Sequence, residues 1–272
     1  MFVSQPALSL AVKELERELG TPLFSRVGRG VRLTAAGTAL LGPARQALRD
    51  VETGRAAVAA VAGVMAGSLS VCSLPTLAAD PMSGVVGSFR RRYPKVRVDM
   101  AAPEGSQELF DLVESGTCEL GLTDALHTAP SLESIDLGSQ SLVFIHPPGT
   151  DDIGVGSTPV GRSLGGTSFV AAPEGTSTRR LLDELLEALD VGPVLAVVTA
   201  QREAIIPLVL AGAGAALVPE SLARFAEQFG AVISRPHPAA VRRLALVHRR
   251  GELSPAAERF CEIARPVGAP ER

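Results

Sequence analysis

The chain has 272 residues, of which 46% are hydrophobic, so it is long and apolar enough to fold as more than one domain. Its formal net charge of −3 at pH 7 excludes a protein that binds polyanions over its whole surface. The charge is unevenly placed, because residues 1–55 carry eight Lys or Arg against five acidic residues and the remainder carries 18 against 24, a pattern that fits nucleic-acid contact at one end only.

Residues 3–20 carry the local signals of one capped helix. Ser4 is a suitable N-cap, Pro6 falls in the first turn, where its missing N–H costs nothing, and Gly20 stands where a left-handed C-cap is favoured. Apolar residues at helical spacing predict one buried stripe: Leu8, Ala11, Val12, Leu15 and Leu19. The opposite side keeps residues available for a polar partner: Gln5, Pro6, Ser9, Lys13 and Arg17.

A basic hairpin is predicted after this helix. Residues 22–34 read as a short apolar anchor and a glycine-punctuated loop, with three arginines in all. A helix fits the major groove of B-DNA, where Gln pairs with adenine and Ser with several base edges. An arginine of the hairpin can enter the adjacent minor groove or hold phosphates. This arrangement is typical of a recognition helix followed by its wing.

These segments resemble the winged helix-turn-helix of LysR-type transcriptional regulators. The resemblance rests on Val3–Ser9, Leu15–Gly20 and the stretch from Pro22 through Arg29 to Gly37. It implies that a double-stranded DNA operator is contacted by Gln5, Pro6 and Ser9 from the recognition helix and by Arg29 from the wing. The alternative for this segment is an ordinary amphipathic helix and turn on a globular domain.

Members of this family usually carry about two further helices before the Ser-Gln-Pro motif. Here Met1 stands where the second of those helices would end, so Leu8, Val12 and Leu15 lack a partner surface. Burying one such side chain contributes about 1.5–3 kcal/mol, so the loss for several is serious. We therefore expect that Met1 is an internal methionine taken as the start, or that the protein is a shortened product. A shortened protein that senses an effector and dimerises without binding DNA is the alternative function.

Residues 34–65 predict a long, alanine-rich linker helix. Thr34 can cap it, Pro43 is expected to kink it or remove one hydrogen bond, and Gly54 weakens it further. An apolar side without a local partner is typical of an intersubunit coiled coil, with packing on its own domain as the alternative. In the resembled family this helix pairs two protomers, which implies a homodimer or homotetramer and a two-fold-related DNA site.

Strand and helix patterns alternate from residue 66 onward in two similar units, which predicts an α/β fold with parallel sheets covered by helices. The expected strands are 68–73, 96–101, 120–123, 142–145, 168–172, 194–198, 215–219, 231–233 and 244–248. The expected helices are 82–93, 107–115, 178–189, 203–210, 221–229 and 255–264.

These units resemble the two-lobed, periplasmic-binding-protein-like (type 2) effector domain of the same family. The implied division is a partial winged helix-turn-helix DNA-binding domain at 1–33, a linker and dimerisation helix at 34–65 and an effector-binding domain at 66–272. Lobe I would comprise 66–140 and 236–272, and lobe II 141–235.

Small polar side chains follow several of the predicted strands. In open α/β sheets, small molecules bind beyond the carboxyl ends of the strands, where helix N-termini offer free N–H groups and a positive dipole. The resemblance implies an effector pocket between the lobes, lined by Ser73, Thr76, Ser106, Thr123, Thr176, Ser177 and Gln201. Helix capping by the same Ser and Thr residues is the alternative. Because loop amides and helix dipoles favour carboxylates, we expect an anionic metabolite as inducer.

The sequence context of a Gly-x-Ser-x-Gly motif argues against an enzyme. Gly161–Gly165 satisfies Gly-x-Ser-x-Gly, but a nucleophile elbow needs a strand before it and a helix after it, whereas here a polar loop precedes it and a strand follows. We therefore predict no catalytic site and no cofactor. A solute-binding protein shares the two-lobed body, but it would need a signal peptide and no recognition-helix motif, so it is the less favoured alternative.

Cysteine content and hydropathy indicate the cellular compartment of the protein. Cys72, Cys118 and Cys261 are widely spaced and odd in number, which predicts buried thiols, with a thiol sensor as the alternative, and neither a disulfide framework nor a paired zinc motif. There is no signal-peptide pattern, and no stretch approaches the roughly 18 apolar residues that span a bilayer. We expect a cytoplasmic protein with no metal site and no membrane partner.

Overall fold

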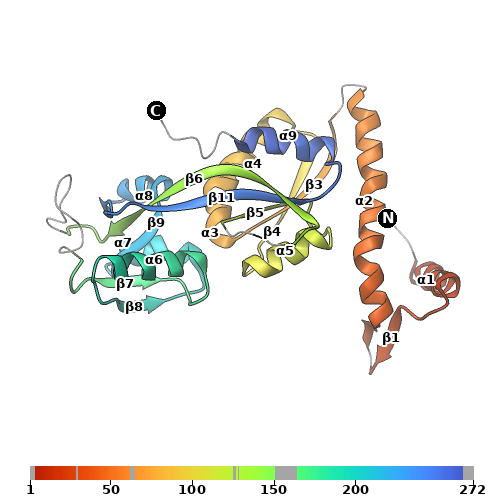
Figure 1. Cartoon of the computed structure of the whole chain (residues 1–272), viewed down its shortest axis with the longest axis horizontal. Coiled ribbons are helices and arrows are strands. Elements are labelled where there is room, and N and C mark those ends of the chain that lie inside the picture. The colour runs from red at the N-terminus through yellow and green to blue at the C-terminus, as the bar shows by residue number, and fades with distance from the viewer. Residues whose placement is uncertain are drawn as a thin grey trace.

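The computed structural model describes residues 4–28, 30–61, 65–124, 127, 129–150 and 164–265. Within these ranges the chain forms a helix and hairpin unit, one long helix and a two-lobed α/β body (Figure 1). The predicted two-lobed α/β fold with an N-terminal helix unit is confirmed. None of the described helices is long and apolar enough to cross a membrane.

The predicted N-terminal helix is present as α1 (Gln5–Leu19). Ser4 holds the N-cap position with an extended backbone, although its side chain makes no capping hydrogen bond. Gly20 ends the helix in the left-handed conformation, with a φ of 67°, which a residue without a Cβ adopts at little cost. The local signals in the sequence therefore placed both ends of this helix correctly.

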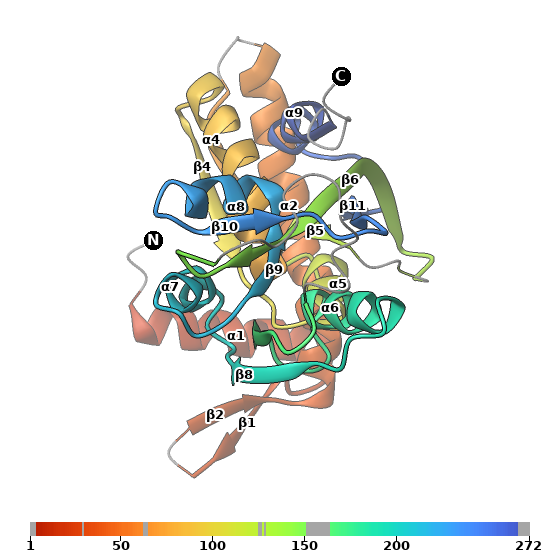
Figure 2. The same ribbon diagram turned by 90° about the vertical axis from the view of Figure 1, so that its left-hand side faces the viewer.

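The hairpin after α1 consists of β1 (Phe24–Val27) and β2 (Gly30–Leu33), paired antiparallel. The Glu16 carboxylate accepts hydrogen bonds from the backbone N–H groups of Leu23 and Phe24, at 2.7 and 3.1 Å. These bonds hold the start of the hairpin against α1. From there the hairpin projects away from the two-lobed body (Figure 2).

The prediction that α1 buries an apolar stripe is wrong for this structure. Leu8, Leu15 and Leu19 are 58%, 41% and 46% exposed. In this unit the described residues supply only α1 and a two-stranded hairpin, whose strands are themselves exposed, so no described element covers the stripe. The apolar side of α1 therefore faces solvent.

The linker is one helix, α2 (Ala35–Val61), which continues through Pro43 and Gly54. The Thr34 hydroxyl caps it by accepting a hydrogen bond from the N–H of Gly37 at 3.0 Å. Pro43 has no N–H to donate, so it interrupts the hydrogen bonding without ending the helix. Along its length α2 lies beside the two-lobed body, and the Arg45 guanidinium donates to the Thr117 hydroxyl at 2.7 Å.

A seven-stranded sheet runs through both lobes, in the order β10-β6-β11-β5-β3-β4 with β9 added on β6. Its strands are β3 (Gly67–Ser73), β4 (Val96–Ala101), β5 (Leu120–Thr123), β6 (Leu132–His146), β9 (Ala216–Pro219), β10 (Val232–Ser234) and β11 (Ala240–Arg249). A second, parallel sheet contains β7 (Ser168–Ala171) and β8 (Val194–Val198).

Helices cover these sheets (Figures 1 and 2). They are α3 (Pro75–Leu77) with a π-type turn (Ala78–Met82), α4 (Ser83–Arg92), α5 (Ser106–Glu114), α6 (Ser177–Ala188), a short 3-10 turn (Arg202–Ala204) with α7 (Ile205–Leu210), α8 (Glu220–Glu227) and α9 (Pro255–Ala264). Most of the predicted elements agree with these bounds within a few residues.

Two strands differ from their predictions and change the sheet from parallel to mixed. The predicted strands at 142–145 and 244–248 are parts of β6 and β11, which pair antiparallel with each other over most of their length. The first half of β6 carries alternating exposed side chains with Gly138 at a φ of 86°, and this polar, glycine-interrupted stretch gave no strand signal. These two strands connect the lobes (Figure 1).

The hydrophobic core is divided between the lobes. Lobe I packs α4, α5 and α9 on β3 and β5, with the rings of Phe89 and Phe260 5.3 Å apart. Two further clusters fill lobe II, one of which contains the Phe144 and Phe169 rings, 5.9 Å apart. The three cysteines are buried free thiols, as predicted.

Candidate functional site

The N-terminal end of α1 presents an exposed polar face. Gln5, Pro6 and Ser9 are all exposed, and because they stand at positions i, i+1 and i+4 they share one side of the helix. Lys13 and Arg17 continue this side and are also exposed. The face has the length and the chemistry to lie along a DNA groove.

The hairpin beside it is basic. Arg26 on β1 and Arg32 on β2 are exposed, and the backbone pairs Arg26 with Val31 and Ser25 with Arg32. Arg29, the predicted wing residue, lies outside the described residues. Arg26 and Arg32 were not singled out from the sequence, although arginine in a projecting hairpin is the signal that identifies them.

A small cleft lies between the lobes, where strand ends and helix N-termini meet. Lobe I contributes Leu74, Pro75, Thr76, Glu104, Gly105 and Ser106; lobe II contributes Gly175, Thr176, Ser177, Thr178 and Arg202. Its volume is about 30 Å³, the space of one or two water molecules. At this volume the cleft is too small for a metabolite.

The N-termini of α5 and α6 open on this cleft from opposite lobes. Thr176 caps α6, because its hydroxyl accepts from the N–H of Arg179 at 3.4 Å and donates to the Pro173 carbonyl at 2.8 Å. Ser106 is the first residue of α5, directly after the N-cap Gly105. Two positive helix ends thus face the same small space.

Arg202 adds a cation to the cleft. Its guanidinium donates to the carbonyls of Thr199 and Ala200 at 3.2 and 3.4 Å. Burial lowers the pKa of Arg202, while Glu104 and Glu203 act in the opposite direction.

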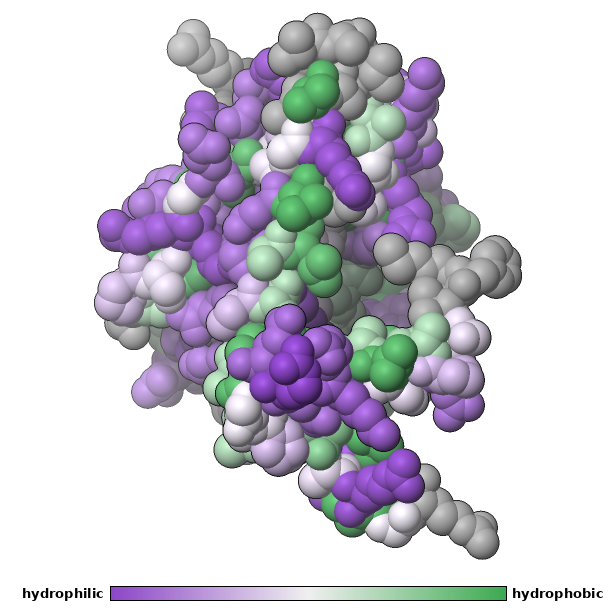
Figure 3. All heavy atoms as spheres, turned by 90° about the vertical axis from the view of Figure 1, so that its right-hand side faces the viewer, coloured by the Kyte–Doolittle hydropathy of each residue, from purple (hydrophilic) through white to green (hydrophobic). Residues whose placement is uncertain are grey.

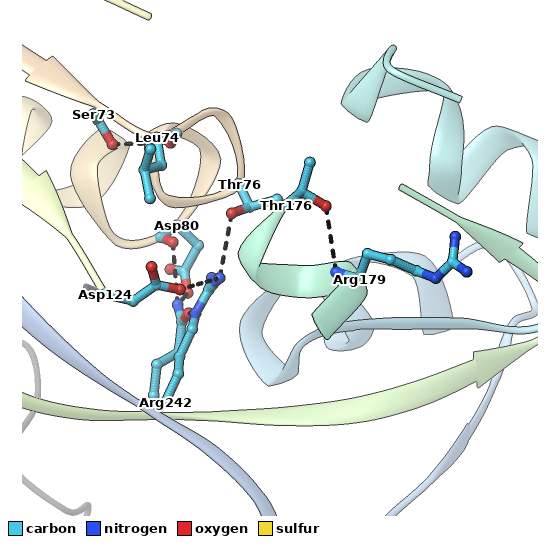
Figure 4. A network of polar contacts seen from close by, with 9 residues as sticks. Ser73, Leu74, Thr76, Asp80, Asp124, Thr176, Arg179 and Arg242 are labelled. Carbon is cyan, nitrogen blue, oxygen red and sulfur yellow. Dashed lines mark hydrogen bonds and ion pairs between the residues drawn. The ribbon is translucent and has the colours of Figure 1, made fainter. Parts of the chain in front are cut away.

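A buried polar cluster lies directly behind Thr76 (Figure 4). Arg242, which is 4% exposed, donates from Nε to the Gln140 amide oxygen at 2.7 Å and from Nη1 to the Thr76 hydroxyl at 3.2 Å. Asp124 Oδ2 lies 3.7 Å from Arg242 Nη1. The Gln140 amide nitrogen donates to the Asp80 carbonyl at 3.1 Å and to the Asp80 carboxylate. This cluster joins the crossing strands β6 and β11 to the cleft wall.

Two family models match the chain. The model described as "LysR substrate binding domain" covers residues 62–269, and the model described as "Bacterial regulatory helix-turn-helix protein, lysR family" covers residues 1–38. The chain belongs to the LysR family of transcriptional regulators.

Two relatives of this LysR-type regulator are each about a quarter identical to it over the aligned residues. The chain is 26% identical over 220 residues to the uncharacterized HTH-type transcriptional regulator YybE of Bacillus subtilis (strain 168), covering 81% of this chain and 75% of that protein. It is 28% identical over 216 residues to the HTH-type transcriptional regulator CbbR of Rhodospirillum rubrum, covering 79% and 70%.

Solved structures of LysR-family proteins have the same fold. Full-length OxyR from Pseudomonas aeruginosa, in a variant form, aligns with a TM-score of 0.75 at 20% identity and covers 99% of this chain and 90% of that one. CbnR, described as a LysR family transcriptional regulator, aligns with a TM-score of 0.65 at 24% identity, covering 97% and 91%.

Four of the seven predicted effector residues line the cleft between the lobes: Thr76, Ser106, Thr176 and Ser177. Ser73 and Thr123 are buried and do not line it, and the Ser73 hydroxyl donates to the Leu74 carbonyl at 3.1 Å. Gln201 is exposed beside Arg202. The roles of all seven stay predictions.

Sequence reasoning missed the charged residues around the cleft. Arg202 lines the cleft and Asp124 and Arg242 lie behind it, but none of the three is among the effector contacts predicted from the sequence. Arg242 lies within the part of β11 that gave no strand signal, so only pairing with β6 brings it to Gln140. Most of the Gly-x-Ser-x-Gly motif, residues 161–163, lies outside the described residues.

Proposed function

We propose that this LysR-family chain is an effector-responsive regulator that reads an operator with α1 and its hairpin. Gln5, Pro6 and Ser9 would contact bases or phosphates in the major groove, and Arg29 would contact DNA from the wing. The exposed polar face of α1 beside a basic hairpin is the observation that supports this proposal. A structure of full-length CbnR with its target DNA exists for a protein of the same fold.

We infer that the effector binds in the cleft between the lobes. The proposed contacts are Ser73, Thr76, Ser106, Thr123, Thr176, Ser177 and Gln201, with an anionic group drawn to the N-termini of α5 and α6. The division into a DNA-binding domain at 1–33, a linker at 34–65 and an effector domain at 66–272, with lobe boundaries near residues 140 and 236, is part of this proposal. An effector domain of QuiR in complex with shikimate has the same fold.

We further propose a homodimer or homotetramer joined through α2. Leu41, Leu48, Val51 and Val58 are exposed on one side of this helix and follow heptad spacing (Figure 3). We propose that this regulator acts in the cytoplasm, and no step of this function requires catalysis or a cofactor.

DNA selection followed by effector titration tests this function. The full chain is incubated with a random DNA pool, and we expect enrichment of a two-fold-related site. Ser106→Ala and Thr176→Ala should bind that site normally but respond less to the inducer, because both residues line the cleft and lie far along the chain from α1 and its hairpin. Absence of any enriched sequence would contradict the DNA-reading role, and an unchanged inducer response in both variants would remove these residues from the effector site.

A further inference from the structure

The buried cluster behind Thr76 is incompletely paired. Among the described residues, neither carboxylate oxygen of Asp124 has a hydrogen-bond partner, and Arg242 Nη2 also lacks one. Both side chains are nearly inaccessible, at 2% and 3% exposure. Leaving a buried charged group without hydrogen bonds is costly, so such groups are usually completed by an ordered water, an ion or a ligand.

The charge of this cluster is negative overall. Asp80 and Asp124 supply two carboxylates, whereas Arg242 supplies one guanidinium. Burial lowers the pKa of Arg242 to about 10, opposed by Asp124 and Asp80, so Arg242 stays charged near neutral pH. The two unpaired Asp124 oxygens therefore leave capacity for a cation or a hydrogen-bond donor, and Nη2 of Arg242 leaves capacity for an acceptor.

The opposite side of the cleft favours an anion. The N-termini of α5 and α6 and the Arg202 guanidinium face it, against one exposed acidic side chain, Glu104. Thr178, which is 8% exposed, has a hydroxyl without a hydrogen-bond partner among the described residues. Nε of Arg202 also lacks a partner there. This wall suits a carboxylate.

Thr76 separates the two regions. It lines the cleft and at the same time accepts the hydrogen bond from Arg242. In Figure 4 its hydroxyl lies above the guanidinium, on the side of Thr176, with Asp124 beside Arg242. A ligand that displaces the Thr76 hydroxyl would reach the carboxylate of Asp124.

We propose that the effector is a small amino acid. Its carboxylate binds at the N-termini of α5 and α6 beside Arg202, and its ammonium group binds the carboxylate of Asp124 past Thr76. This inference rests on the proposed function, in which the cleft is the effector site. Because the cleft holds only about 30 Å³ in this structure, the proposal requires that the lobes move apart to admit the ligand.

The test is a matched ligand panel on the full chain. Each of the common protein amino acids is compared with the acid that lacks its amino group and the amine that lacks its carboxylate, by thermal melting and calorimetric titration. We expect at least one amino acid to bind and both truncated analogues to bind at least tenfold more weakly. A deaminated acid that binds as tightly as its amino acid, or no binding by any amino acid, overturns the proposal.

Asp124→Asn locates the ammonium contact. The substitution should raise the dissociation constant of the amino acid at least tenfold and change that of the deaminated acid less than twofold. Asp99→Asn is the control, since Asp99 is an exposed carboxylate on β4 paired with Arg97. Equal weakening of both ligands by Asp124→Asn would contradict the contact. If Asp124→Asn does not fold, the ligand panel on the unaltered protein still decides.

Ser106→Trp separates this inference from the proposed function, because its side chain fills the cleft. If a deaminated acid binds as tightly as the amino acid and Ser106→Trp abolishes this binding, the cleft is the effector site but the ligand class is wrong. If Ser106→Trp leaves amino-acid binding intact, both the ligand inference and the assignment of the cleft fail.

Discussion

The pKa values of the buried side chains Arg242 and His146 depend on whether the groups next to them are charged. Arg242 is deeply buried yet stays charged near neutral pH, because Asp124 and Asp80 oppose the effect of desolvation. His146 is 2% exposed and has only an uncharged partner, the Ser234 hydroxyl at 2.8 Å. Burial therefore lowers the pKa of His146 to about 4.

His146 makes stability depend on pH. The unfolded chain protonates this ring below its ordinary pKa of 6.5, whereas the folded protein resists protonation down to about pH 4. Stability is thus fully present above about pH 6.5 and falls as the pH drops toward 4, by about 3 kcal/mol in total. His146→Gln, measured by urea unfolding across this range, should lose that part of the slope.

The exposed His237 provides the matched control. His237→Gln should keep the pH slope of the unaltered protein. Parallel pH profiles for the unaltered protein and His146→Gln would show that this ring does not carry the effect.

At the scale of elements, the start of α2 depends on a close approach between backbones. A Cβ at Gly37 would lie 2.1 Å from the Leu23 carbonyl oxygen, which also accepts a hydrogen bond from the N–H of Thr34 at 2.9 Å. Gly54, in the same helix, has nothing within 4 Å of a Cβ. The two glycines therefore have different reasons to be present.

Gly37→Ala should open the junction between the hairpin and α2. Relieving the clash costs about 1–3 kcal/mol, so hydrogen exchange of the Thr34 amide should accelerate about 5- to 150-fold. Gly54→Ala should leave that amide unchanged and favour α2 by up to about 1 kcal/mol, since alanine is the better helix former. Equal protection of Thr34 in both variants would refute the close-approach argument.

Local sequence signals predicted most helices and strands but not which strands pair with one another. The capped helix α1, the strand β4 and the helix α9 lie where spacing and caps placed them. The length of β6 and β11 comes from pairing between segments about 100 residues apart, which no local pattern encodes. The same pairing brings Arg242 to Gln140, so the charged cluster behind the cleft could not be predicted, whereas the hydroxyls at helix N-termini could.

At the scale of the whole molecule, α2 offers an assembly surface. Leu48 is 69% exposed in the middle of the heptad-spaced stripe. In a paired helix, two copies of Leu48 together contribute about 3–6 kcal/mol. Leu48→Asp should therefore raise the dimer dissociation constant at least about a hundredfold, as measured by light scattering across a dilution series.

Ala39→Asp is the control for assembly, because Ala39 is exposed on the other side of α2. It should leave the oligomer intact. An unchanged molar mass for Leu48→Asp at all concentrations would contradict assembly through this stripe.

Base reading by α1 is tested most sharply by the sequence specificity that Gln5 confers. Fluorescence anisotropy compares the unaltered chain, Gln5→Ala and Arg29→Ala on the selected operator and on random DNA of equal length. We predict that Gln5→Ala loses about 1–3 kcal/mol on the operator and nothing on random DNA, whereas Arg29→Ala weakens both similarly. An equal loss on both DNAs for Gln5→Ala would contradict base reading by α1.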